Sequence, residues 1–216
     1  MDTLLPTTKH RRGRRTARQD RALADPGPAL VSLDQLAHEP LITGSQPLIL
    51  DIGFGSAEAV TALAQAQPGI AILAVDMHTP GIGDLLASIQ ERSLTGIRII
   101  EADVRHVLTM LPEGRLIGVR TFFPDPWPKK RHHRRRLVTT DFADHLAACV
   151  AIGGHWHLAT DWEEYADAML EAIVASPHWT GGKVPRPEWR PVTRYERRGQ
   201  AAGRTPVDLW FERIAA

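Results

Sequence analysis

The residues whose types and spacing could do chemistry lie together in residues 121–136. Asp125 stands there between two prolines, which stop helix and ladder formation and restrict the backbone around the carboxylate. Trp127 follows with a flat apolar face for stacking, and residues 129–136 contain six Lys or Arg, two His and no acid. A stiffly held carboxylate, an aromatic face and a run of cations suit the binding of one base of a polyanion. The alternative is a proline-rich turn followed by a solvated basic segment.

A second pattern is a glycine loop with acids at the ends of neighbouring predicted strands. Asp51 is followed by Gly53 and Gly55, which allow a sharp turn and a close approach to a ligand. Asp76 and Asp103 come at the ends of the next two strands, so all three carboxylates are expected at one edge of a parallel sheet. Asp76 is placed to accept from ribose hydroxyls and Asp103 to hold an adenine amino group. Asp51 would attract an ammonium and repel a pyrophosphate, which favours S-adenosylmethionine over a dinucleotide; for the glycines alone, a plain strand-to-helix turn is the alternative.

The elements that must position these residues alternate between strand and helix. Short apolar strands separated by helical crossovers predict a parallel sheet with both faces covered. After residue 176 a stretch rich in Pro, Gly and Trp breaks the alternation, and residues 192–195 and 207–212 are predicted to form a closing antiparallel hairpin. The other predicted strands are 47–52, 70–75, 97–101, 116–123 and 155–160, and the helices are 57–65, 82–92, 104–111, 139–150 and 162–175.

Composition favours one soluble enzyme-sized domain. The 216 residues are 43% hydrophobic, and no apolar run approaches the ~18 residues of a membrane span. No secretory signal is evident, and the single cysteine, Cys149, excludes an intrachain disulfide, so we expect a cytoplasmic protein. Residues 47–216 are expected to form this domain, preceded by a basic, partly disordered extension over residues 1–46 with at most one helix, near residues 16–24.

Charge is strongly segregated along the chain. The formal net charge is only +1, from 26 Lys and Arg against 25 Asp and Glu. Residues 9–18 and 129–136 each hold six of the basic residues and no acid, so the remainder has 14 basic against 25 acidic residues. Local positive potential on an otherwise acidic protein is typical of a protein that binds one structured nucleic acid. For residues 9–18 a disordered basic tail is the alternative.

Five separated motifs give the chain a family resemblance over residues 47–213. They begin at Asp51 (Asp-Ile-Gly-Phe-Gly), Val75 (Val-Asp-Met-His-Thr-Pro-Gly-Ile-Gly), Phe122 (Phe-Phe-Pro-Asp-Pro-Trp-Pro-Lys-Lys-Arg-His-His), Ala159 (Ala-Thr-Asp-Trp-Glu-Glu-Tyr-Ala) and Arg190 (Arg-Pro-Val-Thr-Arg-Tyr-Glu-Arg-Arg-Gly). With these motifs the chain resembles the bacterial tRNA (guanine-N7-)-methyltransferases. The resemblance implies an α/β, Rossmann-like class I methyltransferase fold with a mostly parallel seven-stranded sheet and helices on both faces. It also implies methyl transfer from S-adenosylmethionine to a tRNA guanine, the guanosine at position 46 of the variable loop in this family.

The resemblance also implies roles for individual residues, carried over position by position. Asp125 would be catalytic and would also contact the cofactor; for guanine N7, which has no proton to remove, we expect it to position the base through the N1 and N2 edge. For Asp161, expected to bind substrate, the sequence equally allows a cap on the helix predicted from Trp162. The expected cofactor residues are Asp51, Gly53, Gly55, Asp76, Asp103 and Asp125; the substrate residues are Lys129, Asp161, Thr193, Arg194, Tyr195 and Glu196; and the RNA contacts are Arg131, His132, His133, Arg134, Arg135 and Arg136.

The sequence departs from the family pattern at three positions of the expected cofactor site. Asp51 and Asp76 stand where the family commonly has Glu, and Ala57 replaces the usual third glycine. A positive φ at Ala57 would cost roughly 1 kcal/mol, unless the helix begins earlier.

The expected partner is tRNA, with no membrane and no metal, because His155 and His157 lack a third ligand. We expect a monomer, with a homodimer as the alternative. Two other functions stay open: a related methyltransferase for another base or a small molecule, which the basic run disfavours, and a noncatalytic RNA-binding protein, which the set of cofactor acids disfavours.

Overall fold

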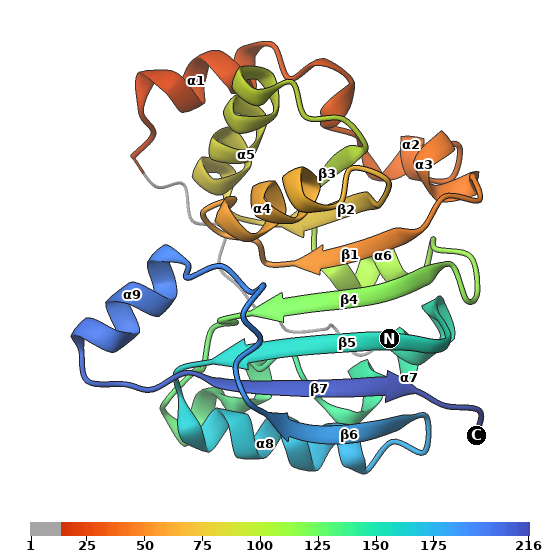
Figure 1. Ribbon diagram of the computed structural model, residues 1–216, viewed down its shortest axis with the longest axis vertical. Helices are drawn as coiled ribbons and strands as arrows, with labels where there is room; N and C mark the ends of the chain where they lie inside the picture. The colour runs from red at the N-terminus through yellow and green to blue at the C-terminus, as the bar shows by residue number, and fades with distance from the viewer. Residues whose placement is uncertain (1–13) are drawn as a thin grey trace.

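The computed structural model describes residues 14–216, which fold around one seven-stranded sheet (Figure 1). The strand order is β3-β2-β1-β4-β5-β7-β6. The first five strands along the chain are parallel to one another, whereas β7 runs antiparallel to both β5 and β6. The strands are β1 (Leu48–Ile52), β2 (Ala71–Asp76), β3 (Ile97–Glu101), β4 (Leu116–Phe122), β5 (Val150–Thr160), β6 (Trp179–Val184) and β7 (Val207–Arg213).

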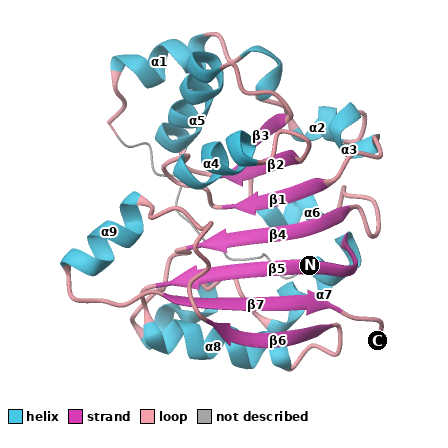
Figure 2. Cartoon of the chain, viewed as in Figure 1, coloured by secondary structure: helices cyan, strands magenta, loops and turns pink. Residues whose placement is uncertain are grey.

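Helices cover both faces of this sheet (Figure 2). All five residues of β1 and the first five of β2 are buried, as strands covered on both faces require. Separate apolar clusters form on the two faces. The α/β fold with a mostly parallel seven-stranded sheet, expected from the sequence, is confirmed. One face carries α1 (Ala17–Ala24), α4 (Glu58–Ala66) and α5 (Thr79–Arg92), and the other carries α6 (Val104–Leu108), α7 (Thr140–Cys149) and α8 (Glu163–Val174).

The described part of the N-terminal extension contributes to the core. Helix α1 starts at a capping box formed by Thr16 and Gln19 and buries Ala22 against α5. It confirms the helix predicted near residues 16–24, but the limit of one helix is wrong, since α2 (Leu33–Leu36) and α3 (Pro40–Thr43) follow. These helices are four residues each, too short to give a clear periodic pattern. Residues 9–13 of the basic segment lie outside the described residues.

The predicted closing hairpin is wrong in one of its strands. Strand β7 pairs in antiparallel fashion with β5 and β6, and residues 192–195 instead lead into α9 (Arg194–Ala201). Strand β6 contains Gly181 and Gly182, and because glycine has a low strand propensity, propensity alone does not predict this strand. A side chain at Gly181 would collide with the carbonyl oxygen of Trp210. Thr193 caps α9 by accepting from the backbone N–H of Glu196 at 3.2 Å, and this Thr-x-x-Glu spacing was an available helix-start signal. Helix α9 lies beside the carboxyl ends of the parallel strands (Figure 1).

Two helix starts bear directly on the site. Helix α4 begins at Glu58, and Ala57 before it has φ +64°, so the helix does not begin earlier and the left-handed conformation is present. Helix α5 begins at Thr79, earlier than the predicted residue 82, because the His78 side chain caps it by accepting from the Gly81 N–H at 3.2 Å.

Candidate active site at the carboxyl ends of the strands

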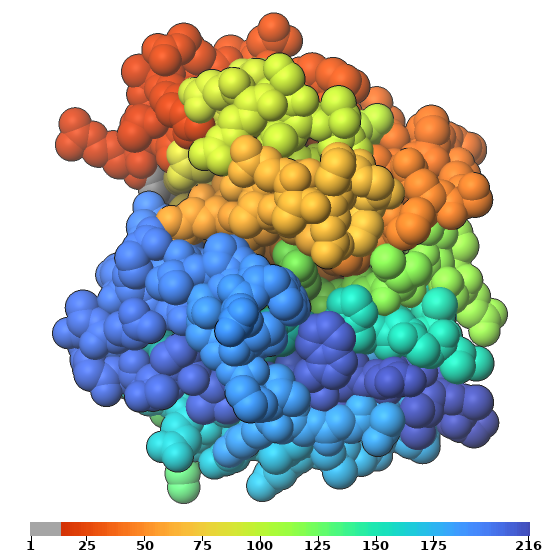
Figure 3. Space-filling view, viewed as in Figure 1, coloured from red at the N-terminus to blue at the C-terminus, as the bar shows by residue number. Residues whose placement is uncertain are grey.

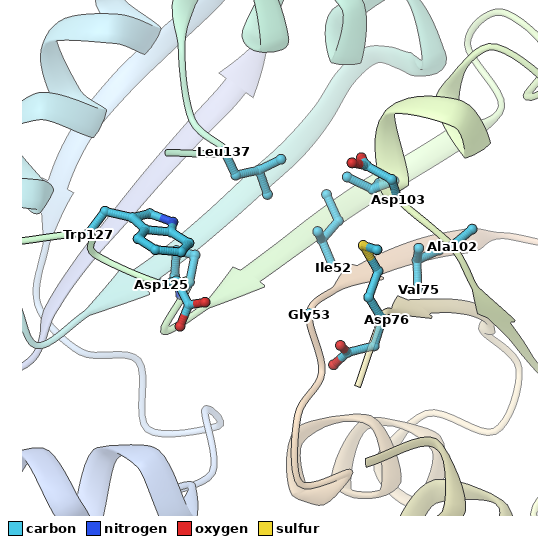
Figure 4. Close-up of a pocket in the computed structure, with 12 residues that line it drawn as sticks. Ile52, Gly53, Val75, Asp76, Ala102, Asp103, Asp125, Trp127 and Leu137 are labelled. Carbon is cyan, nitrogen blue, oxygen red and sulfur yellow. The ribbon is translucent and has the colours of Figure 1, made fainter. Parts of the chain in front are cut away.

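A crevice opens where β1, β2 and β3 end and meets the loop that follows β4. It consists of adjoining pockets of about 70 and 130 Å³ that share Gly53, Asp76 and Asp125 among their lining residues. The carboxylates of Asp76 and Asp125 lie on opposite sides of the opening (Figure 4). Asp103 lines the pocket of about 70 Å³, so the structure brings these three predicted acids together with the predicted glycine loop.

Asp76 ties the glycine loop to β2. Its two carboxylate oxygens accept from the backbone N–H groups of Gly55 and His78, both at 2.9 Å. Burial raises the pKa of Asp76 above its ordinary value, although these hydrogen bonds oppose the shift. Gly53 and Gly55 both have positive φ, at 68° and 58°, and a Cβ on Gly53 would meet nothing within 4 Å. The loop therefore leaves room for a ligand beside a carboxylate that is already fixed.

Asp103 forms the N-cap of α6 and is held by Arg105. The carboxylate accepts from the Arg105 backbone N–H at 3.0 Å and from its guanidinium Nε at 2.9 Å. Burial acts to raise the pKa of Asp103, but the hydrogen bonds from Arg105 hold it below its ordinary value. The carboxylate is therefore ionised at neutral pH and can accept from a ligand amino group. Apolar side chains line the same pocket around it: Ile52, Val75, Ala102, Val104 and Leu137.

Asp51 occupies a different position from the other acids. It is only 1% exposed and lines neither pocket, although the next two residues, Ile52 and Gly53, do. Burial raises its pKa to about 6, and the nearby charge of Arg120 opposes this rise.

The loop that carries Asp125 is held in an unusual backbone conformation. Phe123 and Trp127 on either side have φ values of 54° and 45°, in the left-handed region that non-glycine residues rarely adopt. Such strain persists only where surrounding contacts enforce it, and it concentrates at functional sites. One enforcing contact is Arg136, whose Nε donates to the Pro126 carbonyl at 3.0 Å. Asp125 is thereby presented to both pockets of the crevice.

The basic run after this loop divides into inward-facing and outward-facing members. Arg136 is 7% exposed, pairs with Glu164 and stacks on Tyr165 at 4.6 Å, so it belongs to the fold. Arg135 lies 5.0 Å from the Trp127 ring, and the His132 ring packs edge-on to the same indole at 5.8 Å. His132, His133 and Arg135 are half-buried, whereas the exposed members are Lys129, Lys130, Arg131 and Arg134.

Of the four predicted substrate residues in residues 193–196, only Tyr195 lines the crevice. Its ring lies against Gly55. Glu196 is 1% exposed and pairs with Arg190 at 2.6 Å and Arg186 at 3.0 Å. Thr193 is the cap of α9, and the backbone N–H of Arg194 donates to Glu58 on α4. These three residues therefore hold α9 so that Tyr195 reaches the glycine loop.

Asp161 lies apart from the crevice, because it lines neither pocket. Its Oδ2 accepts from Arg204 Nε at 2.7 Å, and its side chain closely approaches Gly199. The alternative of a helix cap is wrong, since α8 begins at Glu163 with Trp162 at the cap position and no side-chain capping bond.

Two kinds of site residue were not anticipated from the sequence. The apolar walls Ala102, Val104 and Leu137 carry no distinctive pattern, although two of them flank the predicted Asp103. Arg190 opens one of the five motifs without an expected role, yet it is fully buried and joins Glu196 to Asp208 on β7, at 2.6 and 2.7 Å. Its position could have been suspected only from the fold.

Within residues 14–216, no helix is both long and apolar enough to cross a membrane. The same residues include no cluster of three His, Cys, Asp or Glu side chains that could hold a metal ion.

Comparison with known proteins agrees with this geometry. A family model described as "Putative methyltransferase" matches residues 45–209. The tRNA (guanine-N(7)-)-methyltransferase of Nitrosospira multiformis is 45% identical over 177 residues, covering 80% of this chain and 77% of the relative. The enzyme of the same name from Aeromonas hydrophila is 40% identical over 215 residues, covering 94% and 90%.

A solved structure, the 16S rRNA methyltransferase KamB, matches with a TM-score of 0.60 at 15% identity, covering 83% of this chain and 93% of that one. This similarity shows a shared Rossmann-like methyltransferase fold. The crevice fits S-adenosylmethionine, because apolar walls suit its adenine and carboxylates at the strand ends suit its hydroxyl and amino groups. The cofactor is accordingly S-adenosylmethionine, and the chain belongs to the tRNA (guanine-N(7)-)-methyltransferase family.

Proposed function

We propose that this protein transfers a methyl group from S-adenosylmethionine to N7 of a guanine in tRNA, with the variable-loop guanosine at position 46 as its target. One observation carries the proposal: Asp125 faces the cofactor crevice while the same loop continues into Trp127 and the exposed cations of residues 129–134. The carboxylate that would position the base therefore lies at the cofactor pocket, and the residues that would bind phosphates come a few positions later in the same segment.

The cofactor end of the site is assigned to the acids at the strand ends. Asp76 would accept from the ribose hydroxyls, since it is already fixed by the loop amides of Gly55 and His78. Asp103 would hold the adenine amino group beside apolar walls. Asp51, buried next to the crevice residues Ile52 and Gly53, would attract the ammonium group of the methionine part. When bound, the cofactor supplies an electrophilic methyl group on its sulfonium.

The base end of the site needs orientation more than acid or base catalysis. Guanine N7 carries a lone pair and no proton, so no strong general base is required. Orienting donor and acceptor can contribute roughly 7 to 11 kcal/mol. Asp125 would accept from the N1–H and N2–H groups of the guanine, which turns N7 towards the cofactor. Tyr195 and Asp125 both line the pocket of about 130 Å³, and Tyr195 would bound the base on the α9 side.

The surface for the RNA backbone is assigned to the exposed cations beside the crevice. Lys129, Arg131 and Arg134 would contact phosphates, and each neutralised phosphate releases counterions. Arg135 and His132 pack on Trp127 and would hold its ring in place. Arg136 supports the loop from inside. Asp161, paired with Arg204, would act at the far rim of the site.

The test is an assay of the purified protein with labelled S-adenosylmethionine and unmodified tRNA, followed by nucleoside analysis. We expect 7-methylguanosine as the product and loss of label when the variable-loop guanosine is changed to adenosine. Label in a different base would indicate a methyltransferase of other specificity. Binding of tRNA without any label transfer, in protein that binds the cofactor, would indicate a noncatalytic RNA-binding protein.

A further inference from the structure

Arg120 is a buried cationic residue directly beside Asp51, a buried acid on β1. It lies on β4 at the register position paired with Asp51 on β1. Arg120 is 4% exposed and Asp51 is 1% exposed. Within residues 14–216, the Nε and Nη1 groups of Arg120 and the Oδ2 atom of Asp51 make no hydrogen bond. Buried polar atoms without partners are costly, so a charge of opposite sign nearby matters more here than at the surface.

Among the described residues, the cavity beside Arg120 offers it no acid. It lines a cavity of about 250 Å³ between α4 and the segment before α9, and none of the lining residues is Asp or Glu. This region corresponds to the hollow beside α4 in Figure 3. The guanidinium lies 4.9 Å from the Trp189 ring, and the neighbouring His155 stacks on Trp210 at 4.4 Å. Trp189 therefore covers the guanidinium without neutralising it.

The electrostatic effects of the two residues on each other are reciprocal. Burial lowers the pKa of Arg120, and Asp51 opposes that shift. Burial raises the pKa of Asp51 to about 6, Arg120 opposes the rise, and Asp76 on β2 adds to it. Among the described residues, Arg120 is thus the charge that favours the ionised form of Asp51.

We propose that Arg120 is a positioning residue of the cofactor site, which keeps Asp51 ionised so that its carboxylate can attract the ammonium group of S-adenosylmethionine. This inference rests on the proposed cofactor role of Asp51. Asp51 immediately precedes Ile52 and Gly53, which line the crevice, so its charge acts on a ligand there at short range. Arg120 itself need not touch the cofactor.

Other titratable groups near the site must be separated from this effect. Asp76 acts on Asp51 from β2, and His78 before α5, Asp125 after β4 and Tyr195 on α9 line the pocket of about 130 Å³. On the β5 side of Arg120, burial lowers the pKa of His155 and His157, and the charge of Arg120 acts in the same direction. A pH effect that belongs to the pair must therefore disappear when Asp51 cannot titrate.

The experiment measures S-adenosylmethionine affinity by calorimetry from pH 5.5 to 8.5 for wild type and Arg120→Met. The ratio of the two affinities removes titration of the ligand itself. If Arg120 keeps Asp51 ionised, its loss raises the pKa of Asp51. The variant should match wild type near pH 8.5 and fall progressively below it as the pH decreases, by up to about tenfold for each unit by which that pKa rises. Arg120→Lys, which keeps a charge, should follow wild type more closely.

Three controls make the result decisive. Methylthioadenosine has no ammonium group, so its affinity ratio should not change with pH. In an Asp51→Asn background, Arg120→Met should add no pH dependence. Arg115→Met, at the opposite end of β4 where Arg115 donates to the Leu41 and Ile42 carbonyls, should leave the ratio flat. A flat ratio for Arg120→Met, or unchanged cofactor affinity in Asp51→Asn, would overturn the inference while leaving tRNA methylation by the wild-type protein intact.

Discussion

Asp76 holds the glycine loop in place, and we expect the same carboxylate to bind the cofactor. It accepts from the Gly55 and His78 amides and still lines the crevice. We expect Asp76→Ala to weaken S-adenosylmethionine binding by roughly 1.5 to 3 kcal/mol, since the ribose loses a charge-assisted hydrogen bond. Calorimetry in the absence of RNA measures this. Asp167→Ala, which removes a 55%-exposed acid on α8, is the control and should have no effect. Unchanged affinity in Asp76→Ala would mean that the crevice does not bind the ribose.

Asp125 should affect turnover more than cofactor binding. In Asp125→Asn the side chain keeps its size, but an amide presents a donor where the guanine edge needs an acceptor. We expect single-turnover methylation to slow by at least about tenfold, with cofactor affinity changed much less. Rapid-quench assays with tRNA, paired with calorimetry, separate the two. A wild-type rate of methylation in this variant would show that Asp125 has only a structural role between Pro124 and Pro126.

For individual residues, the sequence predicted which acids lie together at the crevice but not which charged side chains are buried. Asp76, Asp103 and Asp125 converge because each lies at or just after the carboxyl end of a parallel strand, and that rule needs only the strand order. Arg136 and Glu196 look like ordinary members of charged runs, and both are buried. Their burial depends on partners far along the chain, Glu164 on α8 for the first and Arg190 before α9 for the second. No local pattern contains that information.

Among the elements, the turn into α4 stores strain at Ala57. Its φ of +64° is a conformation that glycine adopts without penalty, and Ala57 is 2% exposed. We expect Ala57→Gly to raise the free energy of unfolding by about 1 kcal/mol, measured by urea denaturation. Ala62→Gly, inside the same helix, is the matched control and should lower it by about 1 kcal/mol. Equal effects of the two substitutions would show that the strain at Ala57 is relieved by its surroundings.

Arg190 is the group that fixes α9 to the sheet. Its guanidinium pairs with Glu196 on α9 and Asp208 on β7, and all three side chains have no exposed surface. We expect Arg190→Met to lower the free energy of unfolding by about 3 to 5 kcal/mol, because two buried carboxylates lose the arginine that they share. Arg186→Met removes a 31%-exposed partner of the same Glu196 and should cost much less. Denaturation in urea compares the two, and a similar small decrease for both would contradict the anchoring role.

Helix α9 also shows why the carboxyl-terminal elements were harder to predict than the rest. Residues 192–195 contain two β-branched residues and a tyrosine, which favour a strand by propensity. The capping interaction of Thr193 and the buried ion pair of Glu196 instead stabilise a helix in this segment. The true strand, β6, contains two glycines, and one of them, Gly181, lies so close to β7 that a side chain there would collide with the Trp210 carbonyl oxygen. Tertiary contacts overrode local preference in both segments.

Over the whole molecule, the sheet was predictable because its signal repeats. Each parallel strand is a short apolar run followed by a helix, and the rule that such crossover connections are right-handed then restricts how the strands can be arranged. The N-terminal extension was less predictable, since its short helices are stabilised mainly by packing. Two of its described cations also pair within the protein: Arg15 with Asp20 at 2.6 Å, and Arg18 with Glu91 at 2.7 Å. Segregated charge in the sequence therefore overstates the free positive charge near α1.

The same distinction applies to the basic run beside the crevice, and it predicts which arginines hold tRNA. Arg131 and Arg134 are exposed, whereas Arg136 is buried against Glu164. Arg131→Ala with Arg134→Ala should weaken tRNA binding and flatten its salt dependence. The slope of log K against log salt should change by roughly 0.7 to 0.9 for each phosphate that the protein no longer neutralises. S-adenosylmethionine affinity should not change.

The measurement is tRNA binding at several salt concentrations for wild type, this double variant and a control. Arg92→Ala with Lys183→Ala removes the same charge from α5 and β6 and should leave the slope unchanged. Arg136→Ala should instead lower the free energy of unfolding, since it breaks the pair with Glu164 and the bond to the Pro126 carbonyl. An unchanged slope in the Arg131 and Arg134 double variant would place the RNA surface elsewhere, with the arginines of α9 as the next group to test.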